Sequence, residues 1–232
     1  MDDAFTPLDA LRDSAFRIFD PFAYKYVHEC RFVPVGLYEA STLARLYPIV
    51  WMPNLIGDLR AMVILRIRTG GPHHAPPPGM GLGALPNLLQ AYPFRLRDPD
   101  SSEHDIGIEK TLPEQERDGG SYVFDRKGEL LPGARLKVMS LERFLDGQEI
   151  LRELTARLQI YDLLEPVRIP EPYQVKPPLP DMFAALETLD LAALLNGFAP
   201  AQIPATTAFL VAQRMSLYRM HRLLKAADDA NV

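Results

Sequence analysis

The sequence predicts an α+β fold in which a mixed, mainly antiparallel sheet with helical insertions is followed by a helical C-terminal third. One observation is a repeated pattern in residues 43–51 (LARLYPIVW) and 88–96 (LLQAYPFRL), where apolar-periodic residues run through Tyr-Pro into an apolar extended segment. The other is that apolar residues keep helical spacing over the longest stretches in the second half of the chain.

The two Tyr-Pro sites predict corners between a helix and a strand. Proline fixes its own φ, lacks an N–H, and pushes the preceding residue out of the α region. We therefore expect Tyr47 and Tyr92 to mark helix ends, and strands to follow at residues 49–51 and 94–96.

The remaining elements are predicted from apolar spacing and from Pro, Gly and Asp at segment ends. We expect helices at residues 6–19, 39–46, 85–91, 140–164, 181–195 and 201–226, and strands at residues 31–35, 61–67, 105–109, 122–125, 167–169 and 173–175. Residues 22–30 alternate loosely, and residues 31–35 and 105–109 are predicted edge strands. Residues 69–83, 98–103 and 114–120 are predicted loops.

We expect a single domain over residues 1–232, with an N-terminal helix and lead-in (1–30), a strand-rich core (31–136) and a mainly helical part (137–232). The chain is 47% hydrophobic, which is enough for a sizeable core. Its net charge of −5 argues against nucleic acid as the main partner. Cys30 is the single cysteine, which fits a reducing compartment, and no apolar run is long enough to span a membrane. We therefore expect a cytoplasmic protein.

No constellation of residues predicts a catalytic site, a metal site or a cofactor. His73 and His74 fall in a predicted loop, and on an extended segment at most His28 and Cys30 would share a face. An alternative hypothesis is a metal-dependent, peptide-modifying oxygenase, whose candidate ligands would be His28, His104, Asp105 and His221.

Aromatic residues cluster around the corners and the predicted strands, and they could line a peptide-binding groove. Core packing is the alternative explanation for each of them. The candidates are Tyr47, Trp51, Tyr92, Phe94, Tyr122 and Phe124.

The order of several short segments resembles the SapC-like family over about residues 31–224. These segments are RFVPV, LARLYPIVW, AYPFRL, DIGIE, YVFDRKGEL, YDLLEPV and the closing TTAFLVAQRMSLYRMHRLL. The family consists of bacterial proteins associated by name with surface-layer protein genes. The resemblance implies an accessory protein that handles a peptide or surface protein before its modification or export.

Three hypotheses about function therefore stand. The leading one is a non-enzymatic, cytoplasmic accessory protein that binds a peptide or protein partner on the strand-rich half, near the Tyr-Pro corners. The second is the metal-dependent enzyme. The third is a structural subunit that dimerises through the Leu/Met face of the predicted helix at residues 201–226.

Overall fold

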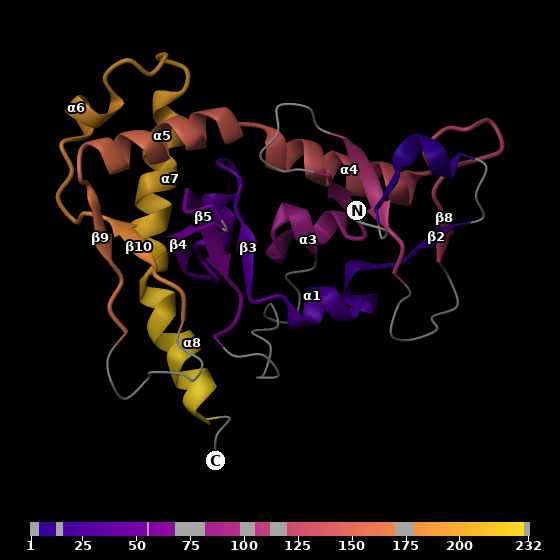
Figure 1. Cartoon of the computed structure of the whole chain (residues 1–232), viewed down its shortest axis with the longest axis horizontal. Helices are drawn as coiled ribbons and strands as arrows, with labels where there is room; N and C mark the ends of the chain where they lie inside the picture. The colour runs from indigo at the N-terminus through magenta and orange to yellow at the C-terminus, as the bar shows by residue number, and fades with distance from the viewer. Residues whose placement is uncertain are drawn as a thin grey trace. The chain divides into compact units, whose positions relative to one another are not determined.

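The computed structural model describes residues 5–12, 16–54, 56–67, 82–97, 105–111, 120–169 and 179–229. The chain divides into two compact units, one formed by Met1–Glu29 and Asn87–Arg143 and the other by Cys30–Pro86 and Phe144–Val232 (Figure 1). The single domain expected over residues 1–232 stays a prediction.

The first unit is built on short antiparallel strands. A three-stranded sheet has the order β1-β7-β6, and β2 pairs with β8. The elements of this unit are β1 (Phe5–Pro7), η1 (Leu8–Leu11), β2 (Arg17–Ile18), η2 (Pro21–Ala23), α1 (Lys25–Glu29), α3 (Asn87–Ala91), β6 (Phe94–Leu96), β7 (Ile106–Glu109), β8 (Ser121–Tyr122) and most of α4 (Pro132–Leu145).

The second unit contains a five-stranded sheet of order β3-β5-β4-β10-β9, in which every pairing is antiparallel. Its elements are β3 (Phe32–Pro34), α2 (Ala40–Leu43), β4 (Ile49–Pro53), β5 (Leu59–Ile64), η3 (Leu82–Ala84), α5 (Gln148–Ile160), β9 (Leu164–Pro166), β10 (Phe183–Ala185), α6 (Leu191–Leu195), α7 (Ile203–Ser216) and α8 (Tyr218–Asp229). Together with the helical C-terminal region, these sheets confirm the predicted α+β class.

Strand β4 is buried on both faces because its side chains alternate between two apolar clusters. Ile49 and Trp51 pack in a cluster with residues of α2, α5 and α7. Val50 and Met52 pack on the opposite face with residues of α8. Helices α7 and α8, which follow one another at the yellow end of the chain in Figure 1, therefore each bury an apolar face against this unit.

Polar side chains of α7 replace one pair of backbone hydrogen bonds between β4 and β10. The pairing of Phe183 with Trp51 would place Ala185 opposite Ile49. Instead, Gln213 Nε2 donates to the Ile49 carbonyl (3.0 Å) and Gln213 Oε1 accepts from the Ala185 N–H (3.3 Å). The Ile49 N–H donates to Ser216 Oγ (2.8 Å), and the Arg214 guanidinium donates to the Ala185 carbonyl (2.6 Å). Helix α7 is thereby fixed in rotation on the sheet.

Both predicted Tyr-Pro corners exist. Helix α2 and the turn after it precede Tyr47-Pro48 and β4, and α3 precedes Tyr92-Pro93 and β6. The predicted hairpin of β4 and β5 is also present, and β3 is an edge strand as expected.

Two predictions for the first unit are wrong. The helix expected at residues 6–19 is replaced by β1, η1 and β2, because residues 5–7 pair with β7. That pairing also places β7 in the middle of its sheet, although residues 105–109 were expected to form an edge. The loosely alternating residues 22–30 contain helix α1.

The C-terminal helices are shorter than expected. The predicted helix at residues 140–164 is two helices, α4 and α5, separated at Gly147, whose φ is +81°. The helix expected at residues 181–195 is present only as α6, which ends at Leu195 as predicted, because residues 183–185 form β10 between β4 and β9. The helix at 201–226 divides into α7 and α8 at Leu217, and the strand expected at 167–169 lies earlier, as β9. The predictions for residues 98–103, 114–119 and 173–175, and for most of 69–83, lie outside the described residues.

Candidate binding surface

Two of the six aromatic candidates, Tyr47 and Trp51, lie in the core of the second unit. Trp51 is fully buried, its Nε1 donates to Thr155 Oγ1 (3.0 Å), and its ring meets Phe209 edge to face at 5.9 Å. Tyr47 is buried in the same cluster, and burial raises its pKa to about 12. Their positions favour the core-packing explanation over contact with a partner.

The other four candidates belong to the first unit. Tyr92 and Phe94 are buried and Phe124 is half-buried, whereas Tyr122 exposes 45% of its surface. The Arg17 guanidinium lies over the Tyr122 ring, 4.7 Å from its centroid, and Arg17 Nη2 donates to the Tyr122 hydroxyl (3.0 Å). Of the six, Tyr122 therefore has the ring most open to a partner, and the binding role of the set stays a prediction.

The second corner carries a cluster that the sequence pattern did not reveal. Tyr92 stacks on Tyr26 (4.9 Å between centroids) and meets Tyr24 edge to face (5.0 Å). Lys137 is buried beside this corner, where its Nζ donates to the carbonyl of Tyr92 (2.5 Å) and lies 3.5 Å from that of Gln90. Tyr24 directly precedes α1 and Tyr26 belongs to it. Nothing in the sequence distinguishes Lys137 from other lysines.

Burial dominates the electrostatics of this cluster. It lowers the pKa of Lys137 to about 8, against a smaller upward effect from Asp20, and it raises the pKa of Tyr24 to about 12. An amine with a lowered pKa is a potential nucleophile. Here, however, Nζ is held by the carbonyls at the C-terminal end of α3, where a cation is favoured. This geometry makes Lys137 a structural cap for the corner.

The candidate metal ligands are not assembled in the part of the chain that the structure describes. His28 lies on α1 and its Nε2 is 2.7 Å from the Phe22 carbonyl, while Asp105 pairs with Arg97 (3.5 Å). His221 belongs to the other unit, and His104 is outside the described residues. Among the described residues, no group of three or more His, Cys, Asp or Glu side chains could hold a metal ion.

Proline blocks three sheet edges at positions where a partner strand would pair. The registers place the backbone of Pro34 on β3, Pro166 on β9 and Pro7 on β1 toward the outside of their sheets. Each proline removes the N–H that an added strand would need. The fourth edge, β6, carries Phe94 and Leu96, which are both buried. Strand addition is therefore disfavoured at every edge of these two described sheets.

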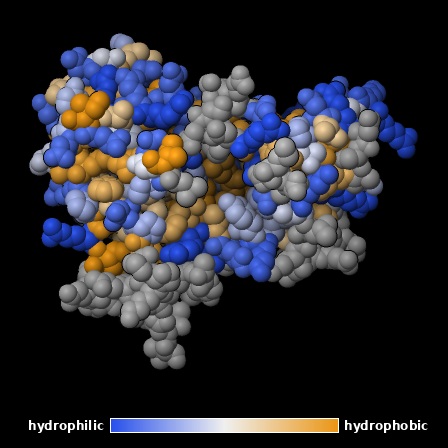
Figure 2. All heavy atoms as spheres, in the orientation of Figure 1, coloured by the Kyte–Doolittle hydropathy of each residue, from blue (hydrophilic) through white to orange (hydrophobic). Residues whose placement is uncertain are grey.

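Helices α7 and α8 instead present an apolar surface. Hydrophobic residues reach the surface among hydrophilic ones in Figure 2, and three large apolar side chains of this helix pair are more than half exposed. Val211, Met215 and Tyr218 expose 51%, 64% and 84% of their surfaces. Their neighbours Gln213 and Ser216 are fully buried, so the exposed and buried faces of the pair are sharply separated.

These three residues belong to a longer line with alternating spacings of four and three. We call it the α7–α8 stripe, and all its members are exposed: Pro204, Ala208, Val211, Met215, Tyr218, Arg222 and Lys225. This spacing is the heptad pattern by which one helix packs along another. The stripe is apolar in its α7 half, whereas Arg222 and Lys225 make its α8 half basic.

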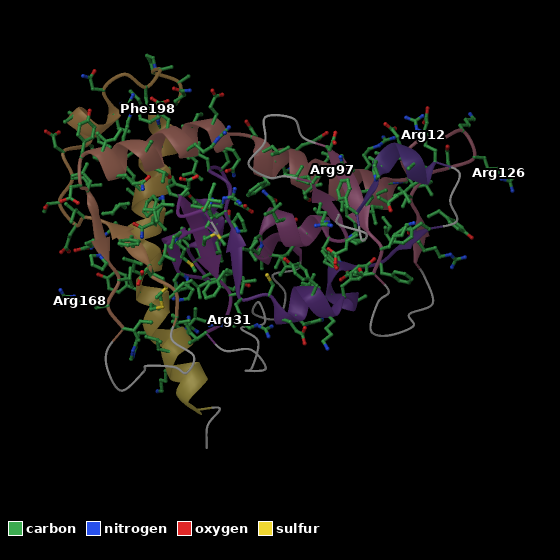
Figure 3. The ribbon with its side chains drawn as sticks, in the orientation of Figure 1. Arg12, Arg31, Arg97, Arg126, Arg168 and Phe198 are labelled. Atoms are coloured by element: carbon green, nitrogen blue, oxygen red, sulfur yellow. The ribbon has the colours of Figure 1, made fainter. Side chains whose placement is uncertain are left out.

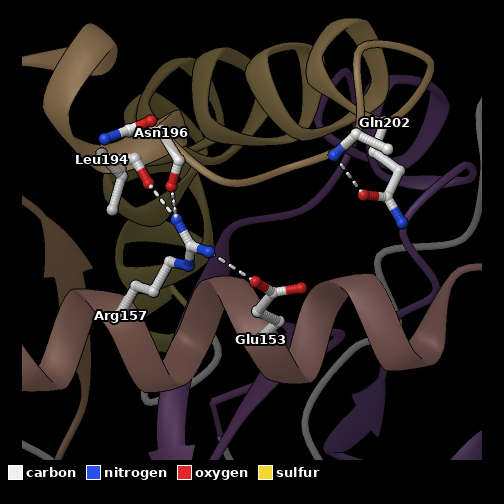
Figure 4. Close-up of polar contacts among 6 residues, drawn as sticks. Glu153, Arg157, Leu194, Asn196 and Gln202 are labelled. Carbon is white, nitrogen blue, oxygen red and sulfur yellow. Dashed lines mark hydrogen bonds and ion pairs between the residues drawn. The ribbon is translucent and has the colours of Figure 1, made fainter.

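The segment that leads into α7 is well ordered by hydrogen bonds (Figure 4). Arg157 of α5 donates to the carbonyls of Leu194 and Asn196 at the end of α6, and it also pairs with Glu153 (2.6 Å). Its guanidinium lies 4.3 Å from the centroid of the Phe198 ring, a side chain labelled in Figure 3. Gln202 Oε1 then accepts from the Ala199 N–H (2.9 Å) just before α7 begins. The α7 half of the stripe therefore lies on a helix whose N-terminal lead-in is anchored to α5.

Fold and surface together define an α+β protein with an exposed, heptad-spaced line of side chains on its C-terminal helices. Within the described residues, no helix is both long enough and apolar enough to cross a membrane.

The model of the SapC family matches residues 8–194, and the chain belongs to this family. The match starts earlier than the expected resemblance and ends before α7, so the α7–α8 stripe follows the matched residues. No curated protein and no solved structure matches the chain.

Proposed function

We propose that this SapC-family chain is a non-enzymatic, cytoplasmic accessory protein that binds a peptide or surface-protein partner before the partner is modified or exported. The partner docks as a helix along the α7–α8 stripe. The observation that carries the proposal is the exposure of Val211, Met215 and Tyr218 at heptad spacing, on helices whose opposite faces are core.

Exposed apolar side chains in a continuous line are costly to solvate, and they commonly mark interaction sites. Recognition of a helix uses anchors at spacings of three and four, which the stripe supplies. Helix docking also agrees with the proline-blocked sheet edges, which disfavour the competing mode of strand addition.

Site-specific photo-crosslinking in cells tests the docking surface. Benzoylphenylalanine replaces Tyr218 in one variant and Tyr161 in a matched control, because both tyrosines are exposed and lie at helix ends. We expect adducts with a discrete protein at position 218 that are missing at position 161. The same adducts at both positions, or none at position 218, would contradict the proposal.

The partner that cross-linking identifies is then purified, and its binding to the chain is measured by calorimetry. The double variant Val211→Ser/Met215→Ser should weaken binding by at least about tenfold, because it removes two exposed apolar anchors. Ile160→Ser is the control and should leave binding unchanged. Ile160 exposes 76% of its surface, but it lies on α5 and is not a member of the stripe. Equal binding by all three proteins would show that the partner contacts another surface.

A further inference from the structure

We infer that the helix docking on the α7–α8 stripe is acidic at the end that faces Arg222 and Lys225 and apolar along the rest of its contact face. The inference rests on the proposed docking surface and adds the chemistry and the polarity of the partner. It follows from the distribution of charge along α7 and α8.

Over residues 201–225 the charge on this helix pair has one sign, and α8 then ends with Asp228 and Asp229. Residues 201–225 contain Arg214, Arg219, Arg222 and Lys225 but no Asp or Glu, although the chain as a whole has a net charge of −5. Arg214 is neutralised by Glu165 of β9, whose Oε1 lies 2.6 Å from its Nη1. The charged members of the stripe are therefore Arg222 and Lys225, both exposed on α8.

This arrangement predicts where along the stripe a docked helix carries its acidic residues, whichever way its chain runs. A helix lying in the heptad register places apolar residues against Ala208, Val211 and Met215, and its next heptad against Arg222 and Lys225. Acidic side chains in that heptad give a complementary potential, whereas basic ones would be repelled. The stripe thus discriminates between partners by charge at one end and by shape at the other.

A second copy of this chain does not satisfy the same requirement. In a parallel pairing of two stripes, Arg222 and Lys225 would face their own copies and repel each other. In an antiparallel pairing they would face the other copy near Pro204 and Ala208, in a segment without acidic residues. Within residues 201–225, homodimerisation through this face would therefore place no acidic side chain opposite Arg222 and Lys225.

A membrane surface is also a poorer occupant. An interfacial helix needs a wide apolar face, and here the wide faces of α7 and α8 are already buried in the core of the unit. What remains exposed is a line of single side chains that fits the width of a helix seam rather than that of a bilayer.

The test uses the full chain and synthetic three-heptad peptides that all carry leucine at the heptad core positions. One class of peptide has glutamates in one terminal heptad, and the other class has lysines in the same heptad. Each class is made in two versions, with the charged heptad at the N-terminus or at the C-terminus, because the partner helix could run in either direction. Binding is measured by fluorescence anisotropy. We expect one glutamate-ended peptide to bind at least about tenfold more tightly than its lysine-ended counterpart. The double variant Arg222→Glu/Lys225→Glu should reverse this preference.

The outcomes separate the inference from the proposed function. If both classes bind equally and Val211→Ser/Met215→Ser weakens both, the docking surface stands and the acidic partner is wrong. If no peptide binds, or the Val211→Ser/Met215→Ser variant binds as wild type does, the docking surface itself is contradicted. A dimer in light scattering that Val211→Ser/Met215→Ser dissociates would show that the occupant is a second copy. Binding to anionic phosphatidylserine vesicles that is lost in Arg222→Glu/Lys225→Glu would show that the occupant is a lipid surface. Either result would contradict the acidic helix.

Discussion

The side-chain amide nitrogen of Gln213 donates a 3.0 Å hydrogen bond to the backbone carbonyl of Ile49, 164 residues earlier in the chain. The same amide accepts from the N–H of Ala185, so a helix side chain completes the hydrogen bonding between two strands of the sheet. This connection decides which face of α7 is buried and therefore which face carries the stripe.

Replacing Gln213 with leucine should destabilise the protein by about 2–6 kcal/mol, because two buried backbone groups lose their partners at about 1–3 kcal/mol each. Urea unfolding measures the change. The control is Gln159→Leu on the exposed surface of α5, which should stay within about 0.5 kcal/mol of wild type. An equal effect of the two substitutions would show that the Gln213 bridge adds nothing to stability.

Thr155→Val should leave the indole Nε1 of Trp51 without its acceptor and lower stability by about 1–3 kcal/mol. Trp51 is the only tryptophan, so its fluorescence reports unfolding of this core directly. Thr155→Ser keeps the hydroxyl and serves as the control. Equal stability of the valine and serine variants would contradict a role for the hydrogen bond.

Gly107→Ala should loosen β1 from its sheet. A Cβ at Gly107 would lie 2.4 Å from the Phe5 ring and 2.5 Å from the Thr6 carbonyl oxygen, so the strand must move. We expect a loss of about 1–3 kcal/mol and faster amide exchange at Thr6, whose backbone faces β7. Gly133→Ala in α4 is the matched control; its Cβ meets only ordinary contacts at 3.9 Å and should be neutral or stabilising.

Stability should rise with pH above about 8 because of Lys137. Its pKa is about 8 in the folded chain against an ordinary value of 10.5, so between these values the unfolded state binds more protons and folding gains stability as pH rises. Below the lower value, the cost of burying the charge is fully present.

The measurement is the unfolding free energy of wild type minus that of Lys137→Met at pH 7.5 and pH 9.5. This difference should become more favourable to wild type by about 2 kcal/mol, at about 1.4 kcal/mol per pKa unit. The tyrosines are common to both proteins and cancel in the comparison. A difference that stays constant with pH would show that Lys137 is charged equally easily in the folded and unfolded states.

The sequence predicted those elements whose signals are local. The corners at Tyr47 and Tyr92 follow from the covalent geometry of proline, and the β4–β5 hairpin follows from apolar runs on either side of a turn. The break at Gly147 also had a local signal. That signal is glycine itself, which suits the positive φ there, but the break was not predicted; the 2.9 Å approach of a Cβ to Leu37 and Tyr38 arises only in the folded chain.

Other elements depend on partners that are distant in sequence. Residues 183–185 are Phe-Ala-Ala, which have helical character locally, yet they form a strand because β4 and β9 supply hydrogen bonds on both sides. Residues 105–109 alternate as an edge strand would, and only pairing with residues 5–7 places them in the middle of a sheet. For the same reason, the six aromatic candidates could not be divided into core and surface before the sheets were known.

The sequence by itself determined the α+β class, the helical character of the C-terminal region, the two Tyr-Pro corners and the resemblance to the SapC family, because each depends on short-range pattern or on the order of motifs. Residues 203–225 carry apolar side chains on more than one side of the helix axis, so periodicity alone could not say which side would remain exposed. The tertiary structure decided this when Gln213 and Ser216 bonded to the sheet and turned Val211, Met215 and Tyr218 toward solvent.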